Sequence, residues 1–197
     1  MVTTVTFETS EGTFKAELFT EKMPITCGNL IDLINQKYYD GLYIHRIVPD
    51  YCIQFGCPNA INPHVYYGTL EEEGIGEGAG PPETSFKSCT GKKHTRDEYG
   101  NIEDELIKDF SNKEGTLSMA NSGEPDTGGS QFFINVKDNP HLDWFNGSSE
   151  SAHPVFGKII EGYDTIVKKI EHAEISETNS EQPAKPIQMK SVTVTIS

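Results

Sequence analysis

An arginine inside an apolar run is the first residue in this chain whose type and position suggest chemistry. Residues 43–56 read YIHRIVPDYCIQFG, in which Arg46 is followed by Ile47 and Val48, and Gln54 comes eight residues later. Arginine is rarely buried unless it is paired. Simple strand alternation would point Arg46 to solvent. The functional alternative places its guanidinium in a cleft, with Gln54 as a neutral partner.

A second stretch, residues 115–135, combines rigid and adaptable segments in the sequence GTLSMANSGEPDTGGSQFFIN. Its apolar runs at 116–120 and 131–136 are typical of strands. Between them lie glycine, asparagine, aspartate and proline residues, which favour turns. An ordinary hairpin connection explains this composition. Loops held between strands are also a usual place for binding and catalysis, so both interpretations stay open here.

Short strands and two helices must position these stretches. Alternation of apolar and polar residues predicts strands over residues 2–7, 13–19, 155–160 and 187–196. The first two form an opening β-hairpin. Apolar residues at i, i+3, i+4 and i+7 predict an amphipathic helix over 24–38, which begins at a proline. A second short helix is predicted over 163–170, and loops are predicted over 59–86, 88–109 and 174–185. Many short strands with two separated helices indicate a mainly β, closed antiparallel structure.

The length and charge of the chain exclude several classes of function. A chain of 197 residues favours one domain, spanning 1–197, with a sizeable core. Sixteen Lys and Arg residues against thirty Asp and Glu residues give a formal net charge of −14, which opposes binding to nucleic acid or to an anionic membrane surface. No apolar run is long enough to span a bilayer, and the first residues lack the apolar centre of a signal peptide.

The four cysteines indicate a reducing compartment, and we therefore expect a cytoplasmic or nuclear protein with free thiols. They are Cys27, Cys52, Cys57 and Cys89, and none forms a Cys-x-x-Cys pair, which argues against structural zinc. His141 and His153 lack further ligands at useful spacing. We expect no metal and no cofactor.

Three motifs together resemble the cyclophilin family of peptidyl-prolyl isomerases. HRIVPDYCIQFGCP is similar to the family's His-Arg-x-x-Pro-x-aromatic-x-x-Gln signature. LSMANSGEPDTGGSQFFIN is similar to its Ser-Met-Ala-Asn to Gly-Ser-Gln-Phe-Phe-Ile signature. PVFGKIIEG, at residues 154–162, follows at the expected distance. Some features, notably CIQFGCP and FGKIIEG, are similar to the short, single-domain, spliceosome-associated type.

The resemblance implies a closed eight-stranded antiparallel β-barrel capped by two α-helices. It also implies an enzyme that rotates X-Pro peptide bonds in proteins, assisting folding or conformational switching. Such rotation needs no nucleophile, since the site must only favour a twisted amide. The expected partners are proline-containing peptides and proteins, and we expect a monomer.

Residue roles follow from the same resemblance. Arg46 matches the family's catalytic arginine, and Gln54 would orient it and touch the substrate. The remaining predicted substrate-binding residues would hold the proline ring, the peptide backbone and the neighbouring surface; they are Tyr51, Cys52, Ala120, Asn121, Ser122, Gln131, Phe133, His141, Leu142 and His153.

Several positions depart from the family pattern. Tyr51 and Cys52 stand where the family most often has Phe and Met, and His141 stands where many members have a Trp associated with tight binding of cyclosporin. We therefore expect cyclosporin to bind weakly. Residues 78–80 replace a Gly-Thr-Gly-Gly element, after a longer and more acidic segment that includes Glu71, Glu72 and Glu73.

These departures leave a second function open, a scaffold that binds proline segments with weak or incidental isomerase activity. The retained Arg46, Gln54, Asn121, Phe133 and His153 favour the enzyme.

Overall fold

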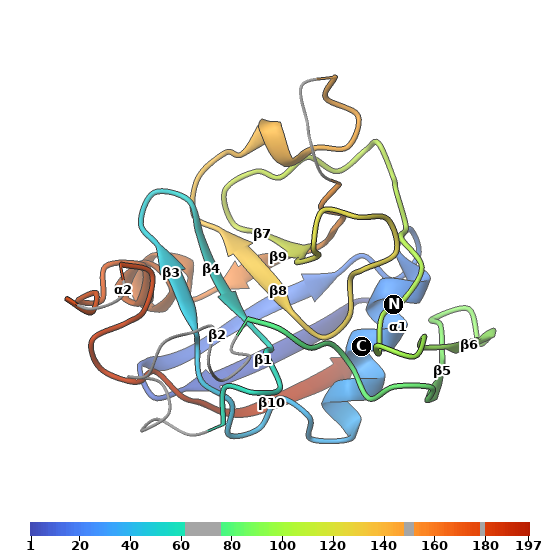
Figure 1. Cartoon of the computed structure of the whole chain (residues 1–197), viewed down its shortest axis with the longest axis horizontal. Helices are drawn as coiled ribbons and strands as arrows, with labels where there is room; N and C mark the ends of the chain where they lie inside the picture. Colours follow the sequence, from blue (N-terminus) through green and yellow to red (C-terminus); the bar gives the residue numbers. More distant parts are fainter. Residues whose placement is uncertain (62–75, 148–151, 178–179) are drawn as a thin grey trace.

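A computed structural model describes residues 1–61, 76–147, 152–177 and 180–197 (Figure 1). The acidic residues Glu71 to Glu73 lie outside this part. In the described residues, eight strands form one antiparallel sheet in the order β10-β1-β2-β9-β7-β8-β4-β3. The strands of this sheet are β1 (Thr3–Thr9), β2 (Gly12–Leu18), β3 (Arg46–Val48), β4 (Cys52–Phe55), β7 (Thr116–Met119), β8 (Phe132–Asn135), β9 (Val155–Glu161) and β10 (Met189–Ile196).

The predicted closure of the barrel is wrong, because the sheet is open between its edge strands β3 and β10. Across this gap, Tyr43 and Gln188 form an isolated antiparallel bridge, and Ile44 N donates a backbone hydrogen bond of 2.9 Å to Ile187 O. β3 has three residues, and the facing chain at 180–188 runs as a loop. A continuous ladder therefore does not form, and the architecture is an open half-barrel.

The predicted opening hairpin is confirmed, since β1 and β2 pair along their whole length. Its alternation sends one set of side chains inward. Phe7 lies opposite Phe14 in the register, and the two buried rings stack with centroids 4.8 Å apart. Both residues belong to the main core.

Helix α1 (Pro24–Asn35) confirms the first predicted helix, although it ends three residues before Tyr38. Lys37 adopts a positive φ of 60°, which ends the helical path. The buried face, which includes Leu30, Leu33 and Ile34, packs against β10. Figure 1 shows α1 at the right of the molecule and α2 at the left.

The second predicted helix is present but has two parts. It begins as a π-helical turn, Tyr163–Val167, and continues as α2 (Lys168–Glu171). Val167 and Ile170 are buried against the core. α2 lies close to β4, and Figure 1 shows it at the left of the sheet, beside β3.

A small two-stranded ribbon of β5 (Ser85–Lys87) and β6 (Lys93–Thr95) was missed where loops were predicted. Beside it, the fully buried Arg96 donates to Asn29 Oδ1 at 2.8 Å and to Asp32 Oδ2 at 2.7 Å. A buried arginine needs such partners. Three-residue strands are too short to show a period in the sequence, which explains the miss.

Alternation along β4 and β8 divides the apolar residues between two clusters. Ile53 and Ile134 point into the main core, whereas Cys52 and Phe133 join a separate cluster with Leu142 on the other face. This second cluster is where the predicted site lies. No helix in the described part of the chain is long and apolar enough to cross a membrane.

Candidate active site

The strand register brings the predicted catalytic pair together. Arg46 on β3 lies opposite Gln54 on β4, and Gln54 lies opposite Phe133 on β8. Residues that are paired across adjacent strands project to the same face of the sheet. A cation, an amide and an aromatic ring therefore lie side by side across three strands.

A chain of side-chain hydrogen bonds runs from the arginine along this face. Arg46 Nη1 donates to Gln54 Oε1 at 3.3 Å, and Gln54 Nε2 donates to Gln131 Oε1 at 3.1 Å. Gln131 Nε2 in turn donates to the carbonyls of Gly76 and Gly78, each at 2.8 Å. The glycine-containing segment thus borders the site, and Gln54 is held in one orientation by partners on both sides.

A carboxylate from the C-terminal part of the chain also binds Arg46. Glu181 Oε2 accepts from Arg46 Nε at 2.8 Å, and Glu181 Oε1 accepts from Nη2 at 3.1 Å. These hydrogen bonds hold the pKa of the Glu181 carboxyl below its ordinary value. Sequence reasoning missed this residue, because it read 174–185 as an exposed polar loop. Nothing local in the sequence connects two residues that are 135 positions apart.

The predicted proline pocket is a compact apolar cluster on the outer face of β4 and β8. Cys52, Phe133 and Leu142 are buried in it, and Tyr51 and Ala120 pack against them. Burial raises the pKa of the Cys52 thiol to about 11, so the thiol is neutral at pH 7. Cys52 is therefore a neutral, buried member of this cluster.

The two predicted histidines contact different aromatic rings of this cluster. His153 meets the Phe133 ring edge to face, with centroids 5.4 Å apart, and its Nδ1 lies 2.9 Å from Met119 O. Because a carbonyl can only accept, Nδ1 carries the proton. Burial lowers the pKa of His153, which favours the neutral ring. His141 is exposed, and its ring stacks on Tyr51.

A cavity of about 510 Å³ adjoins the pocket on the side of Gln131. Ala120, Asn121 and Ser122, which were predicted to bind the substrate backbone, line it together with Gln54. The cavity and the apolar pocket thus share Ala120 as a boundary. In the described residues, no group of three or more His, Cys, Asp or Glu side chains is arranged to hold a metal ion.

The model of the cyclophilin type peptidyl-prolyl cis-trans isomerase/CLD family matches residues 4–194. The chain belongs to this family. Peptidyl-prolyl cis-trans isomerase-like 3 of Rhizopus delemar is 34% identical over 191 residues, which cover 96% of this chain and 93% of that protein. The protein of the same name from Homo sapiens is 34% identical over 190 residues, which cover 96% and 94%.

Solved cyclophilin structures share the fold. A crystal structure of a Cryptosporidium parvum cyclophilin type isomerase matches with a TM-score of 0.74 and 25% identity, over 100% of this chain and 99% of that one. A second crystal structure of that protein, in the presence of the dipeptide Ala-Pro, matches with a TM-score of 0.73 and 26% identity, over 98% and 99%.

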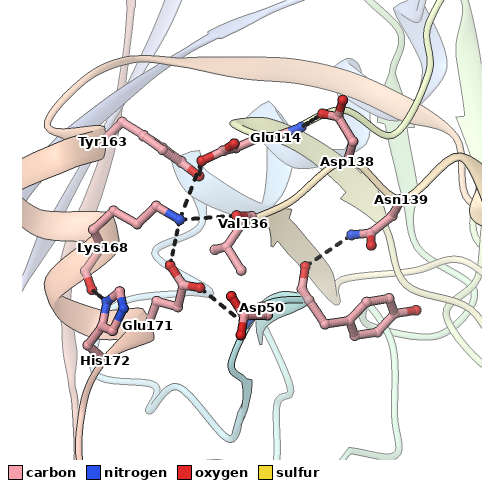
Figure 2. Close-up of polar contacts among 10 residues, drawn as sticks. Asp50, Glu114, Val136, Asp138, Asn139, Tyr163, Lys168, Glu171 and His172 are labelled. Carbon is pink, nitrogen blue, oxygen red and sulfur yellow. Dashed lines mark hydrogen bonds and ion pairs between the residues drawn. The ribbon is translucent and has the colours of Figure 1, made fainter.

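In this cyclophilin-family chain, polar contacts from two other segments hold the turn that contains Asp50 and Tyr51; Figure 2 shows Glu171 and Asn139 approaching it from different sides. Glu171 Oε1 accepts from Asp50 N at 3.2 Å, and Asn139 Nδ2 donates to Tyr51 O at 3.0 Å. The buried Glu171 carboxylate is paired with Lys168 Nζ at 2.8 Å. The pocket wall is therefore braced by α2 and by the segment that precedes Leu142, two supports that the sequence motifs do not contain.

Proposed function

We propose that this chain catalyses cis–trans rotation about X-Pro bonds of proteins through Arg46, with the apolar cluster of Tyr51, Cys52, Phe133 and Leu142 holding the proline ring. The observation that carries the proposal is the position of the Arg46 guanidinium. Its Nη1 lies 3.5 Å from Cys52 Sγ, at the wall of the pocket, and 3.3 Å from Gln54 Oε1. These contacts support our inference that the cation faces the prolyl nitrogen of a peptide bound at the cluster.

Rotation about an X-Pro bond requires a positioned hydrogen-bond donor and a pocket for the proline ring. Amide resonance gives the X-Pro bond a barrier of roughly 18–20 kcal/mol. Acceleration by about 10⁵ requires lowering it by about 7 kcal/mol. As the amide twists, the nitrogen loses conjugation and regains a lone pair, to which Arg46 donates. The proline ring stays in the pocket while the carbonyl of the preceding residue rotates, so catalysis consists of positioning and preorganised electrostatics.

The surrounding residues support these roles. We assign Gln54 to orient Arg46 and to touch the substrate, and Ala120, Asn121 and Ser122 to hold the peptide along the adjoining cavity. Gln131 fixes Gln54 and borders the same cavity. The neutral His153 shapes the pocket beside Phe133 and transfers no proton.

The proposal also covers the cellular compartment and the oligomeric state of the protein. All four cysteines are free thiols in the structure, which suits a reducing compartment, and we propose the cytoplasm or the nucleus. We propose that the protein acts as a monomer on exposed prolines of other proteins.

The test is a protease-coupled isomerisation assay with Ala-Pro and Phe-Pro tetrapeptides, run beside NMR titration of the same peptides. We expect rate acceleration that is proportional to enzyme concentration. Peptide binding with no acceleration on either sequence would contradict the proposal and would support a scaffold that only binds proline segments.

A further inference from the structure

Residues 180–187, which precede β10, lie against the open edge of the sheet. Ile47 N, on β3, donates to Glu181 O at 2.7 Å. Two backbone hydrogen bonds also join residues 180–187 to residues 174–177: Ser176 N donates to Gln182 O and Ala184 N donates to Glu174 O, each at 2.7 Å. Gln182, next to Glu181, is only 2% exposed. The backbone that carries Glu181 is therefore fixed to the strand that carries Arg46.

The Glu181 carboxylate binds one edge of the guanidinium and leaves another edge for the pocket. It accepts from Nε and Nη2, whereas Nη1 points toward Cys52 and Gln54 on β4. A two-point contact between a planar guanidinium and a planar carboxylate fixes the plane of the arginine as well as its position. Gln54 alone makes one contact at 3.3 Å and cannot fix that plane.

Stability alone is a poor explanation for this ion pair. The Arg46 and Glu181 side chains are 32% and 41% exposed. Ion pairs with this much exposure contribute little to the free energy of unfolding. The ion pair instead restricts the orientation of Arg46, because the guanidinium would otherwise rotate about several flexible side-chain bonds.

We propose that Glu181 is a positioning residue for catalysis, which clamps the Nε–Nη2 edge of Arg46 so that Nη1 faces the proline pocket. This rests on the assignment of Arg46 under the proposed function. A carboxylate also lowers the positive electrostatic potential of the arginine that it binds. The alternative is therefore that Glu181 weakens the donor and lowers activity. Positioning is favoured because the carboxylate occupies the edge away from β4, where it does not compete with a peptide for Nη1.

The experiment compares Glu181→Ala and Glu181→Gln with wild type. NMR exchange measurements on an Ala-Pro peptide, at several peptide concentrations, give kcat and KM separately. We expect Glu181→Ala to lower kcat by about ten- to a hundredfold, the scale of a misplaced reacting group. KM should change by less than about threefold, because the pocket that binds the ring is untouched. Glu181→Gln keeps an acceptor oxygen and should recover part of the loss.

Two further measurements separate positioning from a general structural effect. The control variant is Glu161→Ala, which removes a carboxylate from an exposed ion pair with Lys15, at 2.8 Å, at the end of β9. It should keep wild-type kcat and KM. The Arg46 Nε–H signal, observed by ¹⁵N NMR, should exchange with solvent faster in Glu181→Ala than in wild type or Glu161→Ala.

The outcomes distinguish this inference from the proposed function. If Arg46→Ala loses activity but both Glu181 variants keep wild-type kcat, positioning by Glu181 is wrong and the role of Arg46 stands. A rise in kcat for Glu181→Ala overturns the inference in favour of restraint. If Arg46→Ala keeps full activity, the catalytic role of Arg46 in the proposed function is wrong, and the inference about Glu181 is wrong with it. Thermal unfolding checks that each variant is folded. If Glu181→Ala does not fold, the comparison is made between Glu181→Gln and wild type.

Discussion

Phe133 and Gln54 face each other across the β8–β4 ladder, on the side of the sheet that is turned away from the main core. Their neighbours Phe132 and Ile53 point the other way, into the core. Strand alternation alone produces this division. The same two strands therefore contribute one set of side chains to the core of the half-barrel and the other set to the proposed site.

The first prediction is that Arg46→Ala loses most isomerase activity in a folded protein. Arg46 is the cation that we place at the prolyl nitrogen, and removing one preorganised donor of this kind costs about 10²–10³ in rate. The measurement is kcat/KM in the coupled assay, together with thermal unfolding.

Arg46→Lys serves as a control for this prediction. Lysine keeps the positive charge but cannot make the planar two-point contact with Glu181. It should therefore recover only a small part of the activity. Near-normal turnover in a folded Arg46→Ala protein would show that another group carries the chemistry.

The second prediction concerns the floor of the pocket. Phe133→Ala should weaken proline-peptide binding, since the ring is 4% exposed and lies in the cluster that is separate from the main core. Truncating a buried aromatic residue also costs about 3–5 kcal/mol of stability. Peptide titration by NMR and denaturant unfolding measure the two effects independently.

The matched variant is Phe133→Leu, which keeps most of the apolar volume. It should retain more stability and more peptide affinity than Phe133→Ala. Unchanged peptide affinity in folded Phe133→Ala would mean that this ring supports the fold and does not contact the ligand.

The sequence predicted most of the fold and most of the proposed site, and the failures share a cause. Arg46, Gln54 and Phe133 lie in motifs that resemble the cyclophilin family, and this resemblance implied that they share one site. Glu181 does not, because its contact with Arg46 depends on how a loop folds onto an edge strand 135 residues away. The open edge between β3 and β10 was missed for the same reason, as closure depends on whether that loop forms a ladder.

A third prediction is that stability falls as the pH drops below about 6.5, in part through His45. This histidine is 2% exposed, and neither ring nitrogen has a hydrogen-bond partner among the described residues. Burial, followed by the charge of Arg46, lowers its pKa to about 3. Between pH 6.5 and 3 the unfolded chain takes up the proton and the folded protein does not, so stability present above 6.5 is lost by up to about 1.4 kcal/mol per pH unit.

The measurement is the unfolding free energy as a function of pH for wild type and His45→Gln. The variant should show a shallower loss over this range, because the titrating group is gone. His172→Gln, which removes an exposed imidazole, is the control variant. Parallel curves for wild type and His45→Gln would contradict the prediction.

The last prediction is that cyclosporin binds weakly and that His141→Trp strengthens binding. The exposed His141 ring stacks on Tyr51, with centroids 5.8 Å apart and planes 20° apart, at the rim of the pocket. An indole would bury more apolar surface there, at about 25 cal/mol per Å², and would offer a hydrogen bond worth roughly 0.5–1.5 kcal/mol. Together these correspond to about ten- to a thousandfold in affinity.

Titration of cyclosporin against wild type and His141→Trp, with turnover measured in parallel, tests this. Turnover should change less than affinity, because a short proline peptide covers less of the pocket rim than a large cyclic ligand. Trp144 is the residue that could take over the role of the missing indole, although its ring is 38% exposed and meets Phe145 edge to face. If wild type already binds at low nanomolar concentration and Trp144→Ala abolishes that binding, Trp144 fills the place that we assign to His141.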